Sequence, residues 1–151
     1  MRILIQEAKD AKVTVAGRVV GAIERGEVVL VSFTPGDSDA TIQRMIKKML
    51  NLRIFPDEAG NTNLNLAQYG GSILAVSQFT LYADLTRGNR PSFVASLPKE
   101  QAGVLFDHFK VELLKQLPTA QFGIFHADML VSLTNVGPFT IWLDSKELGY
   151  E

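Results

Sequence analysis

Two hydroxyl side chains and one amide side chain lie close together, directly after an apolar segment in the middle of the chain. The segment SILAV is followed by Ser77, Gln78 and Thr80. Backbone N–H groups at the end of a strand can stabilise the negative oxygen that forms during ester hydrolysis, and a hydroxyl can act as a nucleophile or position water. A polar strand end that simply enters a loop is the commoner explanation of this spacing.

The sequence lacks the motifs of several other catalytic classes. It contains no cysteine, which excludes disulfides, thiolate metal sites and a cysteine nucleophile. It also has no Walker A loop, no GxGxxG after a strand and no GxSxG motif. We expect His108 on the surface of a helix, His126 in a packed position or at the rim of a pocket, and Asp128 in a structural role. The sequence therefore predicts neither a metal site nor a cofactor.

The composition is typical of a globular protein with one domain. Of the 151 residues, 46% are hydrophobic and 21% are charged, and the formal net charge is −1. This charge creates no global field that attracts nucleic acid, so an RNA partner requires a local basic patch. The first residues do not form a signal-peptide pattern, and the longest apolar run, VVLVSF, is too short to span a membrane. We expect one cytoplasmic domain, residues 1–151, without a membrane partner.

Hydrophobic periodicity predicts strands and then a helix in the first third of the chain. Ala16-Gly17 is a predicted hairpin turn, and the apolar run 27–33 is a predicted strand buried on both faces. Residues 39–52 follow the helical pattern, and either Asp37 or Ser38 can cap this helix. The apolar positions that are expected to face the core are Ile42, Met45, Ile46, Met49 and Leu50.

The rest of the chain alternates between predicted strands and one further helix. A strand region is expected over 72–83, a helix over 98–117, and two final strands over 121–136 and 139–144. Gly137-Pro138 separates the final strands, because proline cannot donate a ladder hydrogen bond and glycine weakens a strand. These elements predict an α+β fold, either a β-rich barrel or two packed sheets, with two main helices outside.

Three motifs together are similar to those of the D-aminoacyl-tRNA deacylase family. They are SQFTL at 77–81, RGNRPSF at 87–93 and NVGPFT at 135–140, and they occur in the order and spacing of that family. The two longer stretches RIFPDEAGNTNLNL and FHADMLVSLTNVGPFTIWL also resemble it. The resemblance covers nearly the whole chain, and the three motifs in register are far more specific than any one of them.

The resemblance implies a homodimer of compact, β-rich subunits that hydrolyses the ester joining a D-amino acid, or glycine, to the 3′-terminal adenosine of tRNA. It also implies that the bond between Gly137 and Pro138 is cis and projects into the active site of the partner subunit. Main-chain atoms there would form a rigid wall that clashes with the side chain of an L-amino acid. Glycine has no side chain to clash, so glycyl-tRNA is an expected second substrate.

A non-catalytic dimeric module that binds the aminoacyl-adenosine end of tRNA is the alternative function. The intact motifs at Ser77-Gln78 and Gly137-Pro138 favour an enzyme. Release of free amino acid from charged tRNA would distinguish the two functions.

By resemblance, the catalytic group comprises Ser77, Gln78, Phe79 and Thr80. The backbone amides of Phe79 and Thr80 are expected to bind the oxyanion, while Ser77 and Gln78 orient the adenosine end or the motif itself. A water assisted by Thr80, or by the terminal ribose hydroxyl, is preferred over Thr80 as the nucleophile, because no base is evident nearby.

Two arginines follow the catalytic motif in a predicted loop. Arg87 and Arg90 could contact phosphates near the acceptor end of tRNA, or they could form structural salt bridges.

The sequence departs from the family pattern at three places. Glu7 occupies a position where many members carry a basic residue, which is expected to help hold the Gly-Pro element. His126 occupies a position where a small residue is common, and Tyr82 adds bulk after SQFTL. Each departure can reshape the rim of the pocket.

Overall fold

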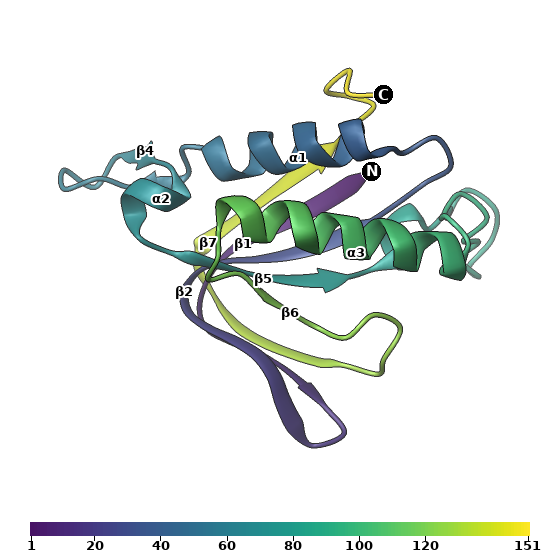
Figure 1. Ribbon diagram of the computed structural model, residues 1–151, viewed down its shortest axis with the longest axis horizontal. Helices are drawn as coiled ribbons and strands as arrows, with labels where there is room; N and C mark the ends of the chain where they lie inside the picture. The colour runs from purple at the N-terminus through teal and green to yellow at the C-terminus, as the bar shows by residue number, and fades with distance from the viewer.

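The computed structural model describes residues 1–151 as a mixed five-stranded sheet with two long helices against one face (Figure 1). The strand order is β6-β5-β2-β1-β7, and a separate two-stranded sheet is formed by β3 and β4. The strands are β1 (Arg2–Val15), β2 (Arg18–Ser32), β3 (Phe55–Pro56), β4 (Thr62–Leu64), β5 (Ser72–Ser77), β6 (Gln121–Phe122) and β7 (Leu130–Asp144). The helices are α1 (Asp39–Asn51), α2 (Leu66–Tyr69), the short 3₁₀ helix η1 (Phe79–Tyr82) and α3 (Lys99–Gln116).

The hairpin of β1 and β2 turns at the predicted residues. Ala16 and Gly17 both have positive φ angles, 48° and 78°. Two central residues with positive φ are typical of the tight turns whose twist matches that of paired strands. The predicted hairpin turn is therefore confirmed.

Helix α1 begins as its sequence predicts. The Ser38 side chain accepts a hydrogen bond from the Thr41 backbone, and the Thr41 side chain accepts one from the Ser38 backbone, so the two residues form a capping box. The helix buries Ile42, Met45, Ile46 and Met49 against the sheet, while Leu50 is partly buried. Ser38 is thus the N-cap, and Asp37 has a different role described below.

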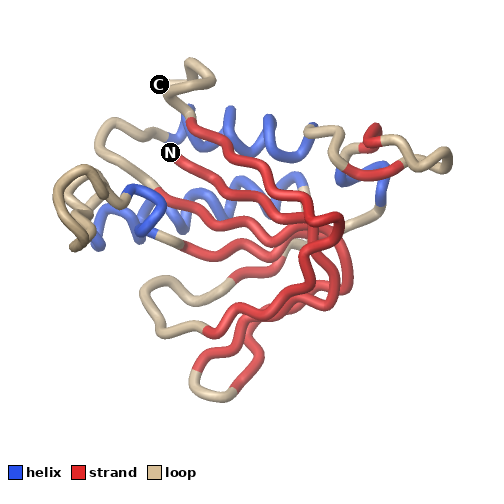
Figure 2. Tube along the Cα trace, turned by 180° about the vertical axis from the view of Figure 1, so that it is seen from behind, coloured by secondary structure: helices blue, strands red, loops and turns tan.

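The sheet separates two hydrophobic clusters of unequal size. Because successive residues of a strand point to opposite faces, Val29 packs beneath α1 and α3 whereas its neighbour Val28 faces the other way. The strands bend sharply midway (Figure 2). The second cluster consists of Ala8, Ala11, Val13, Ile23, Val28, Leu74 and Val76.

Strand β5 is shorter than the sequence predicts. It pairs in parallel with β2 from Gly26↔Ser72 to Val31↔Ser77, and then the chain turns into η1. The prediction of a strand over 72–83 was therefore wrong beyond Ser77. The residues SQFTLY are good strand formers, but the backbone N–H of Leu81 bonds to the Gln78 carbonyl instead of to a neighbouring strand.

Strand β7 runs through Gly137-Pro138 without a break, so the prediction of two final strands was also wrong. Its partners in β1 are Gln6↔Thr140 and Ala8↔Asn135, which leaves residues 136–139 opposite a single residue, Glu7. We call residues 136–139 the Gly-Pro bulge. A proline is tolerated here because β7 is an edge strand and a bulge has no ladder hydrogen bond to lose.

The predicted fold class is confirmed. Strands dominate, and two main helices cover the outside of one sheet face (Figure 1). None of the helices combines the length and the apolar character that crossing a membrane would require.

Candidate active site

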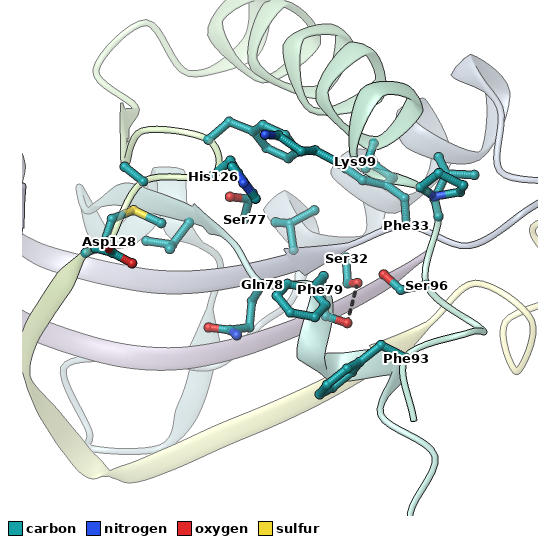
Figure 3. A pocket seen from close by; sticks show the side chains of 18 of the residues that line it. Ser32, Phe33, Ser77, Gln78, Phe79, Phe93, Ser96, Lys99, His126 and Asp128 are labelled. Carbon is teal, nitrogen blue, oxygen red and sulfur yellow. Dashed lines mark hydrogen bonds between the residues drawn. The ribbon is translucent and has the colours of Figure 1, made fainter. Parts of the chain in front are cut away.

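A cavity of about 760 Å³ opens at the carboxyl ends of the parallel strands β2 and β5 (Figure 3). This is the end of a parallel pair at which ligands commonly bind, and the volume suits a small organic ligand. Most of the lining residues are hydrophobic. The polar and charged ones are Ser32, Ser77, Gln78, Ser96, Lys99, His126 and Asp128.

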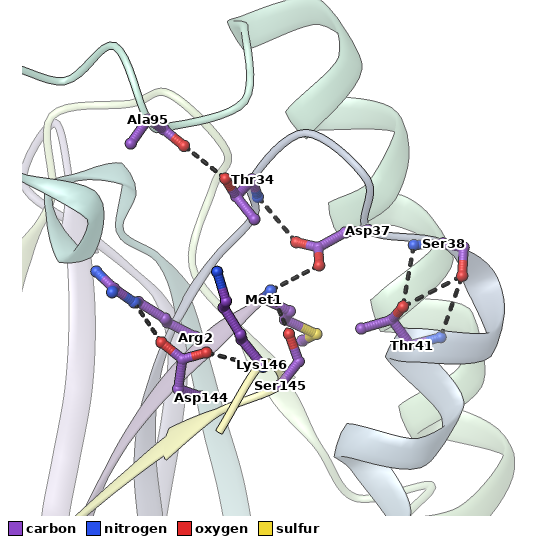
Figure 4. Close-up of polar contacts among 10 residues, drawn as sticks. All are labelled: Met1, Arg2, Thr34, Asp37, Ser38, Thr41, Ala95, Asp144, Ser145 and Lys146. Carbon is purple, nitrogen blue, oxygen red and sulfur yellow. Dashed lines mark hydrogen bonds and ion pairs between the residues drawn. The ribbon is translucent and has the colours of Figure 1, made fainter. Parts of the chain in front are cut away.

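One wall of the cavity is the loop before α3, which is held in place by the residues that directly follow β2. The Leu97 backbone N–H donates to the Phe33 carbonyl at 2.9 Å. The Thr34 hydroxyl donates to the Ala95 carbonyl at 2.7 Å, as Figure 4 shows. Asp37 accepts the Thr34 backbone N–H at 2.8 Å, which fixes the turn before α1. These bonds set the position of the loop relative to the strands.

The predicted catalytic motif lies at the cavity, with one exception. Ser77, Gln78 and Phe79 line it, whereas Thr80 is exposed and lies outside the lining. The Gln78 side-chain N–H donates to the Thr80 hydroxyl at 2.5 Å. An amide donor cannot remove a proton from that hydroxyl, so this contact favours Thr80 as a hydrogen-bonding group.

Backbone donors are available at the start of η1. The first N–H groups of a helix have no partner within it, and in η1 these are the amides of Phe79 and Thr80. A pair of such amides can bind the oxyanion of a tetrahedral intermediate. The sequence placed these two amides in a strand, whereas the structure places them at the start of η1, and their role as oxyanion donors stays a prediction.

Two aromatic rings lie at the cavity mouth. Phe79 and Phe93 contact each other edge to face, with ring centroids 4.9 Å apart, and they are 55% and 37% exposed. Aromatic rings are usually buried, and an exposed ring can stack on a nucleobase.

His126 and Asp128 line the cavity from the loop between β6 and β7 (Figure 3). His126 is exposed and has a φ of 62°, which is uncommon for a residue with a side chain. The exposure of His126 beside the cavity agrees with the predicted position at the rim of a pocket. His108 is also on the surface as predicted, where it contacts Asp39 at 2.7 Å.

Several cavity residues were not predicted as site residues. They come from segments distant in sequence, namely Phe33, Phe93, Leu97, Pro98, Lys99, Ala102, Phe125 and Met129. Three of them carried a signal: Phe93 is the last residue of RGNRPSF, and Phe125 and Met129 lie in the stretch FHADMLVSLTNVGPFTIWL. No group of three or more His, Cys, Asp or Glu side chains is arranged to hold a metal ion.

Gly137 and Pro138 of the Gly-Pro bulge are exposed, whereas Val136 and Phe139 are partly buried, and the bulge lies outside the cavity of its own chain. Its Gly137-Pro138 peptide bond is cis. The Asn135 side chain accepts the Phe139 backbone N–H at 3.0 Å and donates to the Thr140 hydroxyl at 3.1 Å. Glycine is required at 137, because φ is 121° and a Cβ there would lie 3.0 Å from the Phe139 nitrogen.

Glu7, the acidic departure, lies opposite the bulge but makes no hydrogen bond to it, so Asn135 provides the polar support. Its cross-strand partner is Glu27, which is fully buried and has no hydrogen-bond partner for either carboxylate oxygen. Burial, together with the nearby Glu7, raises the pKa of Glu27 to about 8. Burial also raises the pKa of Glu7. Glu27 is therefore largely protonated at neutral pH.

Arg87 and Arg90 are exposed in the loop after η1 and do not line the cavity. Neither arginine takes part in a salt bridge or a side-chain hydrogen bond, so the structural salt-bridge interpretation has no partner residue. Both guanidinium groups are available to a ligand.

Residues 4–144 match the family model described as D-Tyr-tRNA(Tyr) deacylase. The chain belongs to the D-Tyr-tRNA(Tyr) deacylase family. Relatives named D-aminoacyl-tRNA deacylase include one from Listeria innocua, 45% identical with 98% of this chain and 99% of the relative covered, and one from Thermomicrobium roseum, 47% identical with 98% and 96% covered.

Two solved structures share the fold of this chain. The structure of a protein named c-Myc DNA Unwinding Element Binding Protein is 37% identical, with a TM-score of 0.91 over 96% of this chain and 99% of that one. A structure titled as a probable eukaryotic D-amino acid tRNA deacylase is 17% identical, with a TM-score of 0.82 over 94% and 97%, and it shares the fold. The predicted family is confirmed, and membership makes this chain a hydrolase of the deacylase type.

Proposed function

We propose that this protein hydrolyses the ester between a D-amino acid and the 3′-terminal adenosine of tRNA, which releases the free D-amino acid and the tRNA. The observation that carries the proposal is the cavity beside η1, which is lined by Ser77, Gln78 and Phe79. The chain around it matches the deacylase family over residues 4–144. Charged tRNA as the substrate places the activity in the cytoplasm.

The proposed chemistry needs little more than positioning. An aminoacyl ester is already activated, so a held water and a stabilised oxyanion are sufficient for hydrolysis. The amides of Phe79 and Thr80 bind the oxyanion, and the Thr80 hydroxyl together with the terminal ribose hydroxyl orients the water. The apolar cavity walls and the exposed rings of Phe79 and Phe93 receive the terminal adenosine.

The stereochemical filter is proposed to come from a second copy of the chain. Across the sheet, the bulge lies opposite Glu7, which pairs with Glu27 of β2. Val31, the residue of β2 that pairs with Ser77, lies four residues further along that strand. At about 3.3 Å per strand residue, bulge and motif are roughly 13 Å apart along the strands of one chain. The exposed bulge is therefore free to enter the cavity of a partner, where main-chain atoms of Gly137 and Pro138 would exclude an L side chain.

The edge of β7 offers a surface for such a homodimer. Leu130, Val131 and Trp142 on this strand are exposed, and a free edge with apolar side chains is suited to pairing with an identical chain. A filter that rejects by clash also admits glycine, so glycyl-tRNA is the second proposed substrate.

The decisive experiment compares D-tyrosyl-tRNA with L-tyrosyl-tRNA and measures the release of free tyrosine. We expect rapid hydrolysis of the D ester and hydrolysis of the L ester no faster than in buffer alone. Comparable hydrolysis of both would exclude the chiral filter. Binding of charged tRNA without release of tyrosine would instead support the non-catalytic module.

Replacing Thr80 with alanine tests the role of its hydroxyl. We expect kcat to fall by roughly tenfold or less, the loss of about one hydrogen bond, because the oxyanion donors are backbone amides. Single-turnover hydrolysis measures this change, and Thr62→Ala, an exposed threonine on β4, is the control. A near-total loss, with an ester trapped on the threonine of the unmodified protein, would show that Thr80 is the nucleophile.

Replacing Arg87 or Arg90 with alanine tests the phosphate-contact hypothesis. We expect each change to raise KM by roughly two- to fivefold, since an exposed ion pair contributes up to about 1 kcal/mol, and to leave kcat nearly unchanged. The dependence of KM on salt should also become shallower, because fewer phosphates are neutralised. Arg18→Ala at the distant hairpin is the matched control. An unchanged KM in both variants would place the RNA path elsewhere.

A further inference from the structure

The Arg2 guanidinium lies where β1, β7 and η1 meet. Its Nε donates to Asp144 Oδ2 at 2.8 Å, and its Nη1 donates to the carbonyl of Leu81 at 2.8 Å (Figure 4 shows the contact with Asp144). Asp144 also accepts the Lys146 backbone N–H through its other oxygen, so the carboxylate is held from both sides. One side chain thereby connects two paired strands to the helix of the catalytic motif.

Two aromatic rings restrict the same guanidinium further. Its central carbon lies 4.3 Å from the centroid of the Tyr82 ring and 5.2 Å from that of Trp142. A planar guanidinium can stack on rings and donate within its plane at the same time, which an ammonium cannot. The orientation of Arg2 is therefore fixed by four separate groups.

Helix η1 needs support from outside. It has only four residues, and 3₁₀ hydrogen bonds have poor geometry, so such a helix does not hold its own position. Its start is tied to β2, because the Gln78 backbone N–H donates to the Val31 carbonyl at 2.8 Å. The Leu81 carbonyl near its end is tied by Arg2.

We propose that Arg2 is a positioning residue for ester hydrolysis, because it fixes the end of η1 and thereby the direction of the Phe79 and Thr80 amides. This role rests on the proposed function of those amides. Arg2 does not line the cavity, so its effect on the reaction is indirect, and of the groups that it holds η1 is the one that belongs to the catalytic motif. Its side chain is 31% exposed, and a partly exposed ion pair adds little to the stability of the whole domain. The expected consequence of losing Arg2 is local.

The test compares Arg2→Lys and Arg2→Ala with Arg25→Ala. Arg25 is the matched control because its guanidinium also lies over a ring, 4.8 Å from the centroid of Tyr69, away from η1. Three quantities are measured: kcat and KM for D-tyrosyl-tRNA, the hydrogen exchange of the Leu81 and Ala83 amides, and the urea unfolding transition. These two amides report on η1 because they bond to the carbonyls of Gln78 and Thr80.

In Arg2→Ala we expect kcat to fall roughly ten- to a hundredfold, the effect of small misplacements of catalytic groups, with KM changed less than about twofold. Arg2→Lys should show an intermediate loss. Both variants should exchange the amides of Leu81 and Ala83 faster while β1 and β2 stay protected, and Arg25→Ala should match the unmodified protein. If Arg2→Ala does not unfold cooperatively, the kcat and the amide exchange of Arg2→Lys decide whether Arg2 is a positioning residue.

Unchanged kcat in Arg2→Lys, or unchanged exchange of both amides, would overturn the positioning role. Equal losses in Arg2→Ala and Arg25→Ala would overturn it too, because the effect would then not be specific to η1. Failure of the proposed function is recognised separately. In that case the unmodified protein releases no tyrosine, while the amide exchange still reports whether Arg2 holds η1.

Discussion

Replacing Glu27 with glutamine should make the protein more stable near pH 8 and change its stability little near pH 5. The carboxyl group is fully buried without a hydrogen-bond partner, and its cross-strand neighbour Glu7 is a second acid. Both effects disfavour the carboxylate form and raise the pKa of Glu27 to about 8. Glutamine has nearly the same shape and never carries the charge.

The direction of this pH dependence follows from the difference between the pKa of Glu27 in the folded chain and its pKa in the unfolded chain. The pKa of Glu27 in the folded protein, about 8, is above the ordinary value of 4.5. Protonated Glu27 therefore favours the folded state fully below pH 4.5, and this contribution is lost as the pH rises through about 8. The loss is about 1.4 kcal/mol per pH unit for one proton, or roughly 4 kcal/mol between pH 5 and pH 8.

Urea unfolding at several pH values between 5 and 8 measures this dependence directly. The slope of unfolding free energy against pH should be steep for the unmodified protein and shallow for Glu27→Gln. Glu24→Gln, an exposed glutamate on the same strand, should keep the steep slope. Equal slopes for the unmodified protein and Glu27→Gln would mean that the carboxyl group is hydrated in solution.

Replacing Gly26 with alanine is expected to abolish folding under ordinary conditions. Gly26 pairs with Ser72 of β5, and a Cβ at this position would lie 1.9 Å from the Ser72 carbonyl oxygen and 2.5 Å from its nitrogen. The φ angle of 134° is also one that residues with side chains rarely adopt. Because the obstacle is backbone, β5 itself must move. A loss above about 4 kcal/mol would remove most of the stability of a typical domain.

Replacing Gly17 with alanine separates the cost of a clash with neighbouring backbone from the cost of a positive φ angle. Gly17 also has a positive φ, 78°, but nothing lies within 4 Å of a Cβ there. It should therefore cost only the strain of the angle, about 1–2 kcal/mol. Circular dichroism and urea unfolding of the two variants give the comparison. Equal stability of both would show that β5 can shift away from β2 without cost.

Local chemistry explains which elements were predictable. The Ala16-Gly17 turn and the apolar stripe of α1 depend on neighbours within a few residues, so the sequence predicted them correctly, and it narrowed the helix cap to Asp37 or Ser38. The end of β5 at Ser77 and the continuity of β7 depend on which strand lies alongside, and both were predicted wrongly. A bulge on an edge strand leaves no local pattern that differs from a strand break.

In the candidate site, too, residues that belong to one local motif were predictable, and residues that reach the site through distant packing were not. Ser77, Gln78 and Phe79 were predicted from one motif because they are contiguous and match the family pattern. Lys99 and Phe125 reach the cavity only through the packing of α3 and the loop after β6, which local spacing does not reveal. Glu27 was predicted within a buried strand, but the burial of its carboxyl group without a partner depends on cross-strand pairing with another acid.

The pairing of β1 with β7 also determines when the sheet can be completed during synthesis on the ribosome. Strands β1 and β2 are complete by Ser32, whereas β7 begins only at Leu130. Until then one edge of β1 carries unpaired backbone groups that other chains can bind, and contacts between such distant segments form slowly. A nascent chain therefore remains open to aggregation for most of its translation, and slower translation before Leu130 should prolong that exposure.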